Sequence, residues 1–320
     1  MVRARLLELA ERQVGAVNGG DLPTLTRLLA GVRHWRLPSL GQQQQTTHGQ
    51  GGVAAAVGGW AAQMTAARAL ATQVFIDEER RCAAVEWALR YRHADDGPGG
   101  SGGRQLLGGT SFELDDGLEI SAWRSYCDGG RAHTPVPRLD FGDLDPALSP
   151  WRPAPPLAAT CLTRRRDSVM ALLRREAALW AMTEAPPEES RPAFERVFAE
   201  SAKLINPWTV ELSRESRWEG FRSFCANYTD CSVDITHLTL DNERPSLFAV
   251  ERKFRCTNRE TGVRGVDEDW AVGEVVAGEG GGLRLRFCRV YFEPDLTGSQ
   301  EKRKSTGSRL GWDLPSVVNV

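Results

Sequence analysis

The feature that most constrains this fold is an internal repeat, because part of the first half of the chain recurs in the second. Shifting residues 84–128 by 165 positions places them on residues 249–293 without a gap. The stretch GLEISAWRSYCD at 117–128 then matches GLRLRFCRVYFE at 282–293, with Gly, Leu, Arg and Tyr at the same places. The tripeptide AVE recurs at the same offset. Shared strand composition is the alternative explanation, but one offset held by separate motifs indicates two copies of one structural unit.

Hydrophobic periodicity predicts the same order of elements in both halves. In the first half we expect helices over 2–17, from Asp21 onward and over 52–70, with a short strand at GVRHWRLP between the last two. In the second half we expect helices over 167–182, 191–204 and 218–228, with a short strand at PWTVEL before the last. Long strands follow the helices in each half. Helices followed by a run of strands predict an α+β unit whose helices cover one face of an antiparallel sheet.

Length and composition favour two such units in an ordinary globular protein. At 320 residues, with 41% apolar and 26% charged residues, the chain is long enough for two cores. We place the units at 1–128 and 166–297. A Pro-rich linker over 129–165 joins them, and a polar tail with a short basic cluster covers 298–320.

Charge and hydropathy argue against some partners and compartments. A net charge of −2 and a pI near 6.3 give no reason to expect nucleic acid. No apolar run is long enough to cross a membrane, and the charged N-terminus is unlike a signal peptide, so we expect a cytoplasmic protein without a membrane partner. The seven scattered cysteines predict reduced packing thiols and no metal site.

The closing motif, a Gly-rich or acidic turn followed by G-hydrophobic-x-hydrophobic-x-x-x-R-x-Y-x-acid, resembles the nuclear transport factor 2-like superfamily and its SnoaL-like branch in particular. The resemblance implies two tandem cone-shaped α+β barrels, each with three helices packed on a bent antiparallel sheet around an apolar pocket. Because members of this family commonly pair through their sheets, it also implies an intrachain pseudo-dimer in a monomer, or a homodimer.

The resemblance leaves two classes of function open. The first is binding of a small, largely apolar molecule, with or without proton-transfer chemistry such as isomerisation, cyclisation or hydrolysis, and with no cofactor. The second is a non-catalytic adaptor that meets a protein partner through the linker or the outer sheet faces. Pocket volume separates the two, since a ligand site needs a cavity of some hundreds of Å³.

Three residues are the catalytic candidates. Glu86 lies between two alanines on one face of its strand and matches a pocket carboxylate of epoxide-hydrolase-like relatives, so we predict it as the acid or base. The second family carboxylate is replaced by Ser125 here and by Val290 in the second half, which lowers the expectation of activity. His34 or Ser125 would orient a substrate. The alternative for Glu86 is a solvent or interface position beside an arginine.

Five further residues are predicted to bind ligand: Trp35, Trp123, Glu251, Trp208 and His237. The tryptophans offer flat apolar surfaces. Glu251 is the counterpart of Glu86 at the 165-residue offset. The alternative for the tryptophans is that they build the cores of the two units.

Overall fold

The computed structural model describes ten stretches of the chain: 1–36, 57–59, 61–62, 64–93, 103–127, 134–136, 139–142, 162–206, 209–278 and 282–291. The chain divides into two compact units. Unit 1 comprises residues 1–158 and 239–244, and unit 2 comprises residues 159–238 and 245–320. Each is described by itself below.

Two helices open unit 1. Helix α1 (Val2–Gly19) ends at Gly20, whose φ of 64° lies in the left-handed region that favours glycine, and whose N–H donates to the Ala16 and Val17 carbonyls. Helix α2 (Leu22–Leu29) begins at Asp21, whose carboxylate accepts the Thr24 backbone N–H. Residues 57–59 and 61–62 are also helical.

The sheet of unit 1 has the strand order β1-β5-β4-β3-β2, with β6 paired to β4. Its strands are β1 (His34–Arg36), β2 (Met64–Asp77), β3 (Cys82–His93), β4 (Gly103–Leu114), β5 (Ile120–Cys127) and β6 (Thr134–Val136). Strand β1 runs parallel to β5, and the other pairs are antiparallel. The helix predicted over 52–70 is therefore wrong from Met64 on, because pairing with β3 overrides the helix propensity of the alanines there.

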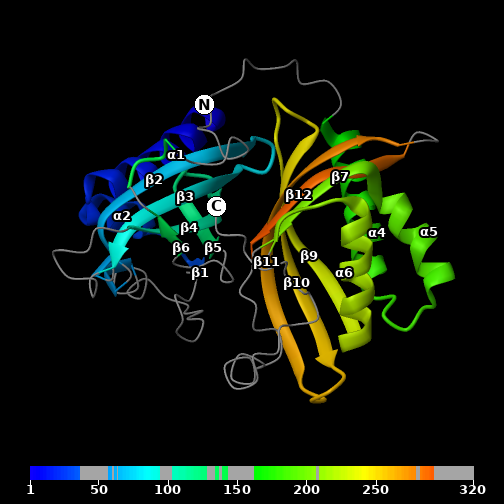
Figure 1. The fold of residues 1–320 in the computed structure, drawn as a ribbon. Helices are drawn as coiled ribbons and strands as arrows, with labels where there is room; N and C mark the ends of the chain where they lie inside the picture. Colours follow the sequence, from blue (N-terminus) through cyan, green and yellow to red (C-terminus); the bar gives the residue numbers. More distant parts are fainter. Residues whose placement is uncertain are drawn as a thin grey trace. The chain divides into compact units, whose positions relative to one another are not determined.

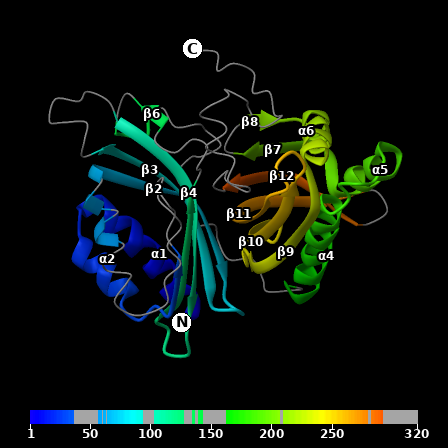
Figure 2. The ribbon, with the colours of Figure 1, turned by 90° about the horizontal axis from the view of Figure 1, so that it is seen from below.

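The core of unit 1 lies between α1 and one face of the sheet. Leu6 and Leu9 of α1 pack with Val85, Phe112 and Trp123 of β3, β4 and β5, all of them buried. Helices α1 and α2 lie on the same side of the sheet, as Figures 1 and 2 show. This helical layer decides which face of each strand points inward.

Unit 2 follows the same plan. Its elements are α4 (Leu162–Trp180), α5 (Pro187–Val197), β7 (Phe198–Asn206), β8 (Thr209–Leu212), α6 (Arg214–Asn227), β9 (Tyr228–Leu240), β10 (Leu247–Asn258), β11 (Arg264–Ala277) and β12 (Leu283–Tyr291). The strand order is β8-β7-β12-β11-β10-β9, and β7 runs parallel to β12 as β1 does to β5. The three helices lie on one side of the sheet (Figure 2).

One predicted helix of unit 2 is too long. The segment expected to be helical over 191–204 leaves the helix after Val197 and continues as β7. Phe198 has extended backbone angles, and β7 then pairs with β12. Sheet pairing again overrides the local helical pattern. The prediction of two tandem α+β cones is confirmed.

Strand register refines the repeat. Glu86 faces Gly109, which faces Tyr126. Glu251, 165 residues after Glu86, faces Trp270, which faces Tyr291, 165 residues after Tyr126. Trp270, however, lies 161 residues after Gly109. The β10–β11 hairpin is therefore four residues shorter than the β3–β4 hairpin, and the β11–β12 hairpin is four residues longer than the β4–β5 hairpin. The two differences cancel, so the sequence match has no gap although β4 corresponds to β11 at an offset of 161.

This register changes one pair in the sequence comparison. At an offset of 161, Gly108 corresponds to Asp269, and Phe112 corresponds to Gly273. The match of Gly108 with Gly273 at the 165-residue offset is thus not a structural equivalence. A compensating exchange appears instead, because Ala83 faces Phe112 in unit 1 whereas Phe248 faces Gly273 in unit 2. Each pair combines one large and one small residue, so the two pairs fill similar volumes.

Candidate functional site

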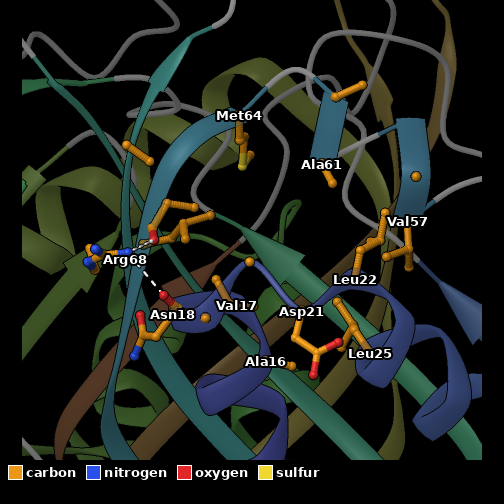
Figure 3. Close-up of a pocket in the computed structure, with 17 residues that line it drawn as sticks. Ala16, Val17, Asn18, Asp21, Leu22, Leu25, Val57, Ala61, Met64 and Arg68 are labelled. Atoms are coloured by element: carbon orange, nitrogen blue, oxygen red, sulfur yellow. Dashed lines mark hydrogen bonds between the residues drawn. The ribbon is translucent and has the colours of Figure 1, made fainter.

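Two cavities that share part of their lining lie in unit 1. The outer one has a volume of about 630 Å³ and is bordered by the end of α1, the start of α2, the helical residues 57–58 and 61–62 and the start of β2 (Figure 3). The inner one, of about 70 Å³, lies between α1 and the sheet. Four apolar residues line both: Val17, Leu25, Val57 and Leu89. Because they share these walls, we treat the cavities as one site with a wide mouth and a narrow inner end.

The mouth is formed where β2 is irregular. The pairing of β2 with β3 shifts between Thr65 and Arg68, and Ala66 in this bulge has a φ of 51°. A non-glycine residue in the left-handed region is strained, and such residues cluster at binding sites. Three hydrogen bonds hold α1 to β2 at this place. The Asn18 side-chain NH₂ donates to the Ala69 carbonyl (2.9 Å), and the Ala69 backbone N–H donates to the Asn18 side-chain oxygen (2.6 Å). Arg68 donates to the Asn18 backbone carbonyl (3.0 Å).

The inner cavity is apolar with three polar side chains, Gln13, Thr110 and Ser125. The remaining lining consists of alanine, valine, leucine and tryptophan side chains. None of its described lining residues is an acid, a histidine, a lysine, an arginine, a cysteine or a tyrosine. This inner end can therefore form hydrogen bonds with a molecule, but it offers no group whose pKa suits proton transfer near neutral pH.

A short hydrogen-bonded chain crosses the sheet at the inner cavity. The indole N–H of Trp87 on β3 donates to the Thr110 hydroxyl on β4 (3.0 Å). The Thr110 and Ser125 hydroxyl oxygens are 2.7 Å apart, so one of them donates to the other. Ser125 also contacts the Gly109 carbonyl at 3.4 Å. These groups satisfy one another within the protein.

Gln13 approaches the cavity from the opposite wall. Its side-chain oxygen accepts the Trp123 indole N–H (3.1 Å). Its side-chain nitrogen is buried and has no hydrogen-bond partner among the described residues. Gln13 is 9% exposed, which makes this amide an unsatisfied donor at an apolar cavity.

The catalytic candidates are separated by the structure. Ser125 lines the inner cavity, whereas Glu86 and His34 line neither cavity. Glu86 is 0% exposed and accepts the Thr72 hydroxyl (2.8 Å) on the other face of the sheet. This follows from strand alternation, because its neighbours Val85 and Trp87 line the inner cavity. The sequence predicted that Glu86 lies in the pocket. The structure instead buries it on the outer face of the sheet, the face opposite the inner cavity.

Of the three predicted aromatic ligand residues, Trp123 alone is placed at a cavity by the described part of the chain. Trp123 lines the inner cavity. Trp35 is buried in the core of unit 1 and lines neither cavity, in keeping with the alternative of core packing. Trp208 lies outside the described residues. Trp87 lines the inner cavity as well, although it was not among the predicted ligand residues.

In unit 2 the corresponding interior holds a buried ion-pair network. Arg252 corresponds to Trp87 at the 165-residue offset. Its guanidinium donates to Glu176 on α4 (2.8 and 2.9 Å) and to Asp269 on β11 (2.8 and 2.9 Å). Burial by itself lowers the pKa of Arg252, but the charges of Asp269 and Glu176 raise it well above its usual range.

Two further groups lie near this network, the half-buried Arg217 and the buried Cys288. Burial lowers the pKa of Arg217 to about 10, and its guanidinium lies 4.8 Å from the Trp180 ring. Burial raises the pKa of the Cys288 thiol to about 12, which makes the thiol unreactive near neutral pH. The place that forms a cavity wall in unit 1 is thus occupied by paired charges in unit 2.

The structure brings the two remaining candidates, Glu251 and His237, together. The His237 Nδ1 atom is 3.6 Å from a Glu251 carboxylate oxygen. Glu251 is buried, and the His237 side chain is 44% exposed. Glu251 alternates with Arg252, which points into the core of unit 2, so this pair lies on the outer face of the sheet.

Gln13 is the site residue that sequence reasoning missed. It follows Leu9 and Ala10 by four and three residues, so it lies on the buried stripe of α1. A polar residue on an otherwise apolar helical stripe was the available signal. Thr110 gave a weaker signal for the site, because it is a hydroxyl side chain among the mostly apolar residues of β4.

Within the described residues, no group of three or more His, Cys, Asp or Glu side chains is placed to hold a metal ion. The same part of the chain contains no helix that is both long enough and apolar enough to cross a membrane.

Comparisons with known proteins identify no family and find only structural matches of low identity. No model of a protein family and no curated protein matches the chain. A putative aromatic ring hydroxylase from Novosphingobium aromaticivorans is 14% identical, with a TM-score of 0.35 over 42% of this chain and 92% of that one. RV0760c from Mycobacterium tuberculosis is 14% identical, with a TM-score of 0.32 over 39% and 91%. An NTF2-like protein of unknown function from Exiguobacterium is 9% identical, with a TM-score of 0.32 over 38% and 98%.

Each of these matches covers about two fifths of the chain and nearly all of the matched protein. Both units of this chain have the strand order and the parallel first strand described above. The tandem α+β architecture predicted from the sequence is thus present in both units.

Proposed function

We propose that unit 1 binds a small, largely apolar, uncharged molecule, with the inner cavity holding one end and the outer cavity the remainder. The observation that carries the proposal is the apolar inner cavity next to a 630 Å³ outer cavity with four shared wall residues. That volume lies within the range of about 300–1,000 Å³ that is usual for ligand sites. Trp123 and Ser125 are the predicted residues that would contact the ligand.

Binding without catalysis is the form of this function that the site supports best. Proton transfer needs a positioned group that gains or loses a proton near the working pH. Ser125 has Thr110 and Gly109 as its hydrogen-bond partners, and neither supplies a general base. At the mouth, Asp21 and Arg68 are the ionisable lining residues, and both are exposed. Apart from these two exposed residues, the described lining offers hydrogen bonding and apolar contact.

The adaptor alternative has less support on the described surface. Besides Met1, the large apolar side chains that are exposed there are Val263 and Val266. Both are at the β10–β11 hairpin, and two valines do not form the extended apolar patch that marks many protein-binding sites.

Ligand binding is tested by blocking the cavity. Val17→Trp would place an indole where the inner and outer cavities share a wall, and Ala61→Trp would place one in the outer cavity. The purified wild type is analysed by mass spectrometry for retained small molecules and screened against apolar compounds by thermal shift. We expect retained or stabilising compounds with the wild type and their loss in both blocked variants.

Glu11→Trp is the matched control, because Glu11 is exposed on the same helix and lines neither cavity. It should bind as the wild type does. Equal binding by the wild type and both folded blocked variants would place the ligand elsewhere, and an absence of binding to the wild type would count against the function itself.

A further inference from the structure

We propose that the ligand of unit 1 presents a hydrogen-bond acceptor, such as a carbonyl or ether oxygen, to the side-chain nitrogen of Gln13. This inference rests on the proposed binding function and states which chemical group the ligand needs. It is carried by the unsatisfied amide of Gln13 at the inner cavity.

Trp123 fixes the orientation of this amide. An indole N–H can only donate, so the atom of Gln13 that faces it at 3.1 Å must be the oxygen. The NH₂ group is therefore the other end of the amide. Rotating the amide to present the oxygen to the cavity would place two donors against each other.

The backbone of α1 holds Gln13 in place. Leu6, Leu9 and Ala10 on the same stripe are at most 3% exposed in the core. The amide therefore stays at the cavity unless the packing of this stripe changes. An unsatisfied buried donor costs about 1–3 kcal/mol, and a ligand acceptor would recover part of that cost.

The other polar groups on the sheet side of the inner cavity already have hydrogen-bond partners in the protein. The Trp87 indole donates to Thr110, and the Thr110 and Ser125 hydroxyl groups are bonded to each other. A hydroxyl also rotates to suit its neighbours, whereas the Gln13 amide is held by Trp123. The two indoles and the aliphatic side chains of the lining favour an apolar body around the acceptor. An uncharged acceptor fits because no described residue of the inner lining is charged.

The test uses two probes that differ in one carbonyl group, 1-tetralone and tetralin. Their dissociation constants are measured by titration calorimetry with the wild type and with Gln13→Met, which keeps the approximate length of the side chain and removes the donor. We expect the tetralone-to-tetralin affinity ratio to fall about 3- to 10-fold in Gln13→Met, the effect of one neutral hydrogen bond. Tetralin binding itself should change little.

Glu11→Met is the matched control, because it places the same side chain on an exposed position of the same helix that lines neither cavity. The wild-type preference for tetralone should persist in this variant. The infrared carbonyl band of bound tetralone gives a second readout, which should lie at lower frequency in the wild type than in Gln13→Met.

The outcomes separate the inference from the function on which it rests. If both probes bind and the affinity ratio and carbonyl band are the same in the wild type and Gln13→Met, the acceptor inference is wrong while ligand binding stands. Binding of tetralin alone would overturn the inference in the same way. If neither probe binds the wild type, the proposed binding function fails as well.

Discussion

The indole ring of Trp87 lies over Gly108, its partner on the neighbouring strand, so closely that no side chain fits between them. A Cβ atom on Gly108 would come within 2.6 Å of two ring carbons and would collide with the Tyr126 carbonyl oxygen. In unit 2 the corresponding partners are Arg252 and Asp269, whose side chains pair at 2.8 Å. One strand geometry thus supports an apolar cavity wall in unit 1 and a buried ion pair in unit 2.

Gly108→Ala should destabilise the protein because both the indole and a backbone carbonyl would have to move. We expect a loss of about 1–3 kcal/mol in the free energy of unfolding, as for other overpacked core sites. Denaturant unfolding followed by tryptophan fluorescence measures it. Gly15→Ala is the control, because Gly15 is exposed on α1 with nothing within 4 Å of an added Cβ. It should stabilise by about 0.5–1 kcal/mol, so equal effects of the two variants would contradict the close packing.

Glu86→Gln should leave ligand affinity unchanged, because Glu86 does not line either cavity. Stability should fall by about 1–3 kcal/mol, since the fully buried carboxylate loses charge-assisted hydrogen bonding such as that from Thr72. Titration with a ligand found in the screen, at a temperature where both proteins are folded, separates these effects. A tenfold loss of affinity in folded Glu86→Gln would place this residue in the ligand site after all.

Arg252→Met should be among the most damaging substitutions in unit 2. It would leave Glu176 and Asp269 buried, at 4% and 5% exposure, without their shared cation. Breaking a buried pair from one side costs about 3–5 kcal/mol. The triple variant Arg252→Met, Glu176→Gln, Asp269→Asn should recover part of this loss, because it leaves fewer buried charges.

Lys253→Met, one residue further along β10, provides the comparison for Arg252→Met. Lys253 pairs with Glu268 at 3.4 Å, and both side chains are about one-third exposed. Exposed pairs contribute about 0–1 kcal/mol, so this variant should unfold close to the wild type. A similar loss in both single variants would show that burial does not control the energetics of these pairs.

Asp21→Asn should alter the acid dependence of stability. Hydrogen bonds from Thr24 hold the pKa of Asp21 below its ordinary value of 3.8. Because the folded pKa is the lower one, the carboxylate stabilises the fold above about pH 3.8 and loses this effect as the pH falls through the folded pKa. We therefore expect the difference in Tm between the wild type and Asp21→Asn to be constant above about pH 5 and to change as the pH falls from there through the folded pKa. A difference that is flat from pH 2 to 7 would contradict this role.

The repeat and the α+β plan were predictable because they depend on local patterns. The copies β3 and β10, and likewise β5 and β12, keep the 165-residue offset in the sheet. The true offset of 161 for β4 and β11 was not predictable. Four residues removed from one hairpin and added to the next leave an ungapped sequence match intact, and only strand pairing reveals the shift.

The sequence by itself determined that Glu86 and Trp87 point to opposite faces of β3, because side chains alternate along a strand. Only the tertiary structure decided which face becomes the inside, through the packing of α1 against Val85 and Trp123. That packing placed Trp87, Ser125 and Gln13 around a cavity and left Glu86 on the far side of the sheet. The physical reason is that periodicity defines two faces, whereas the position of the covering helix depends on contacts between residues far apart in the sequence.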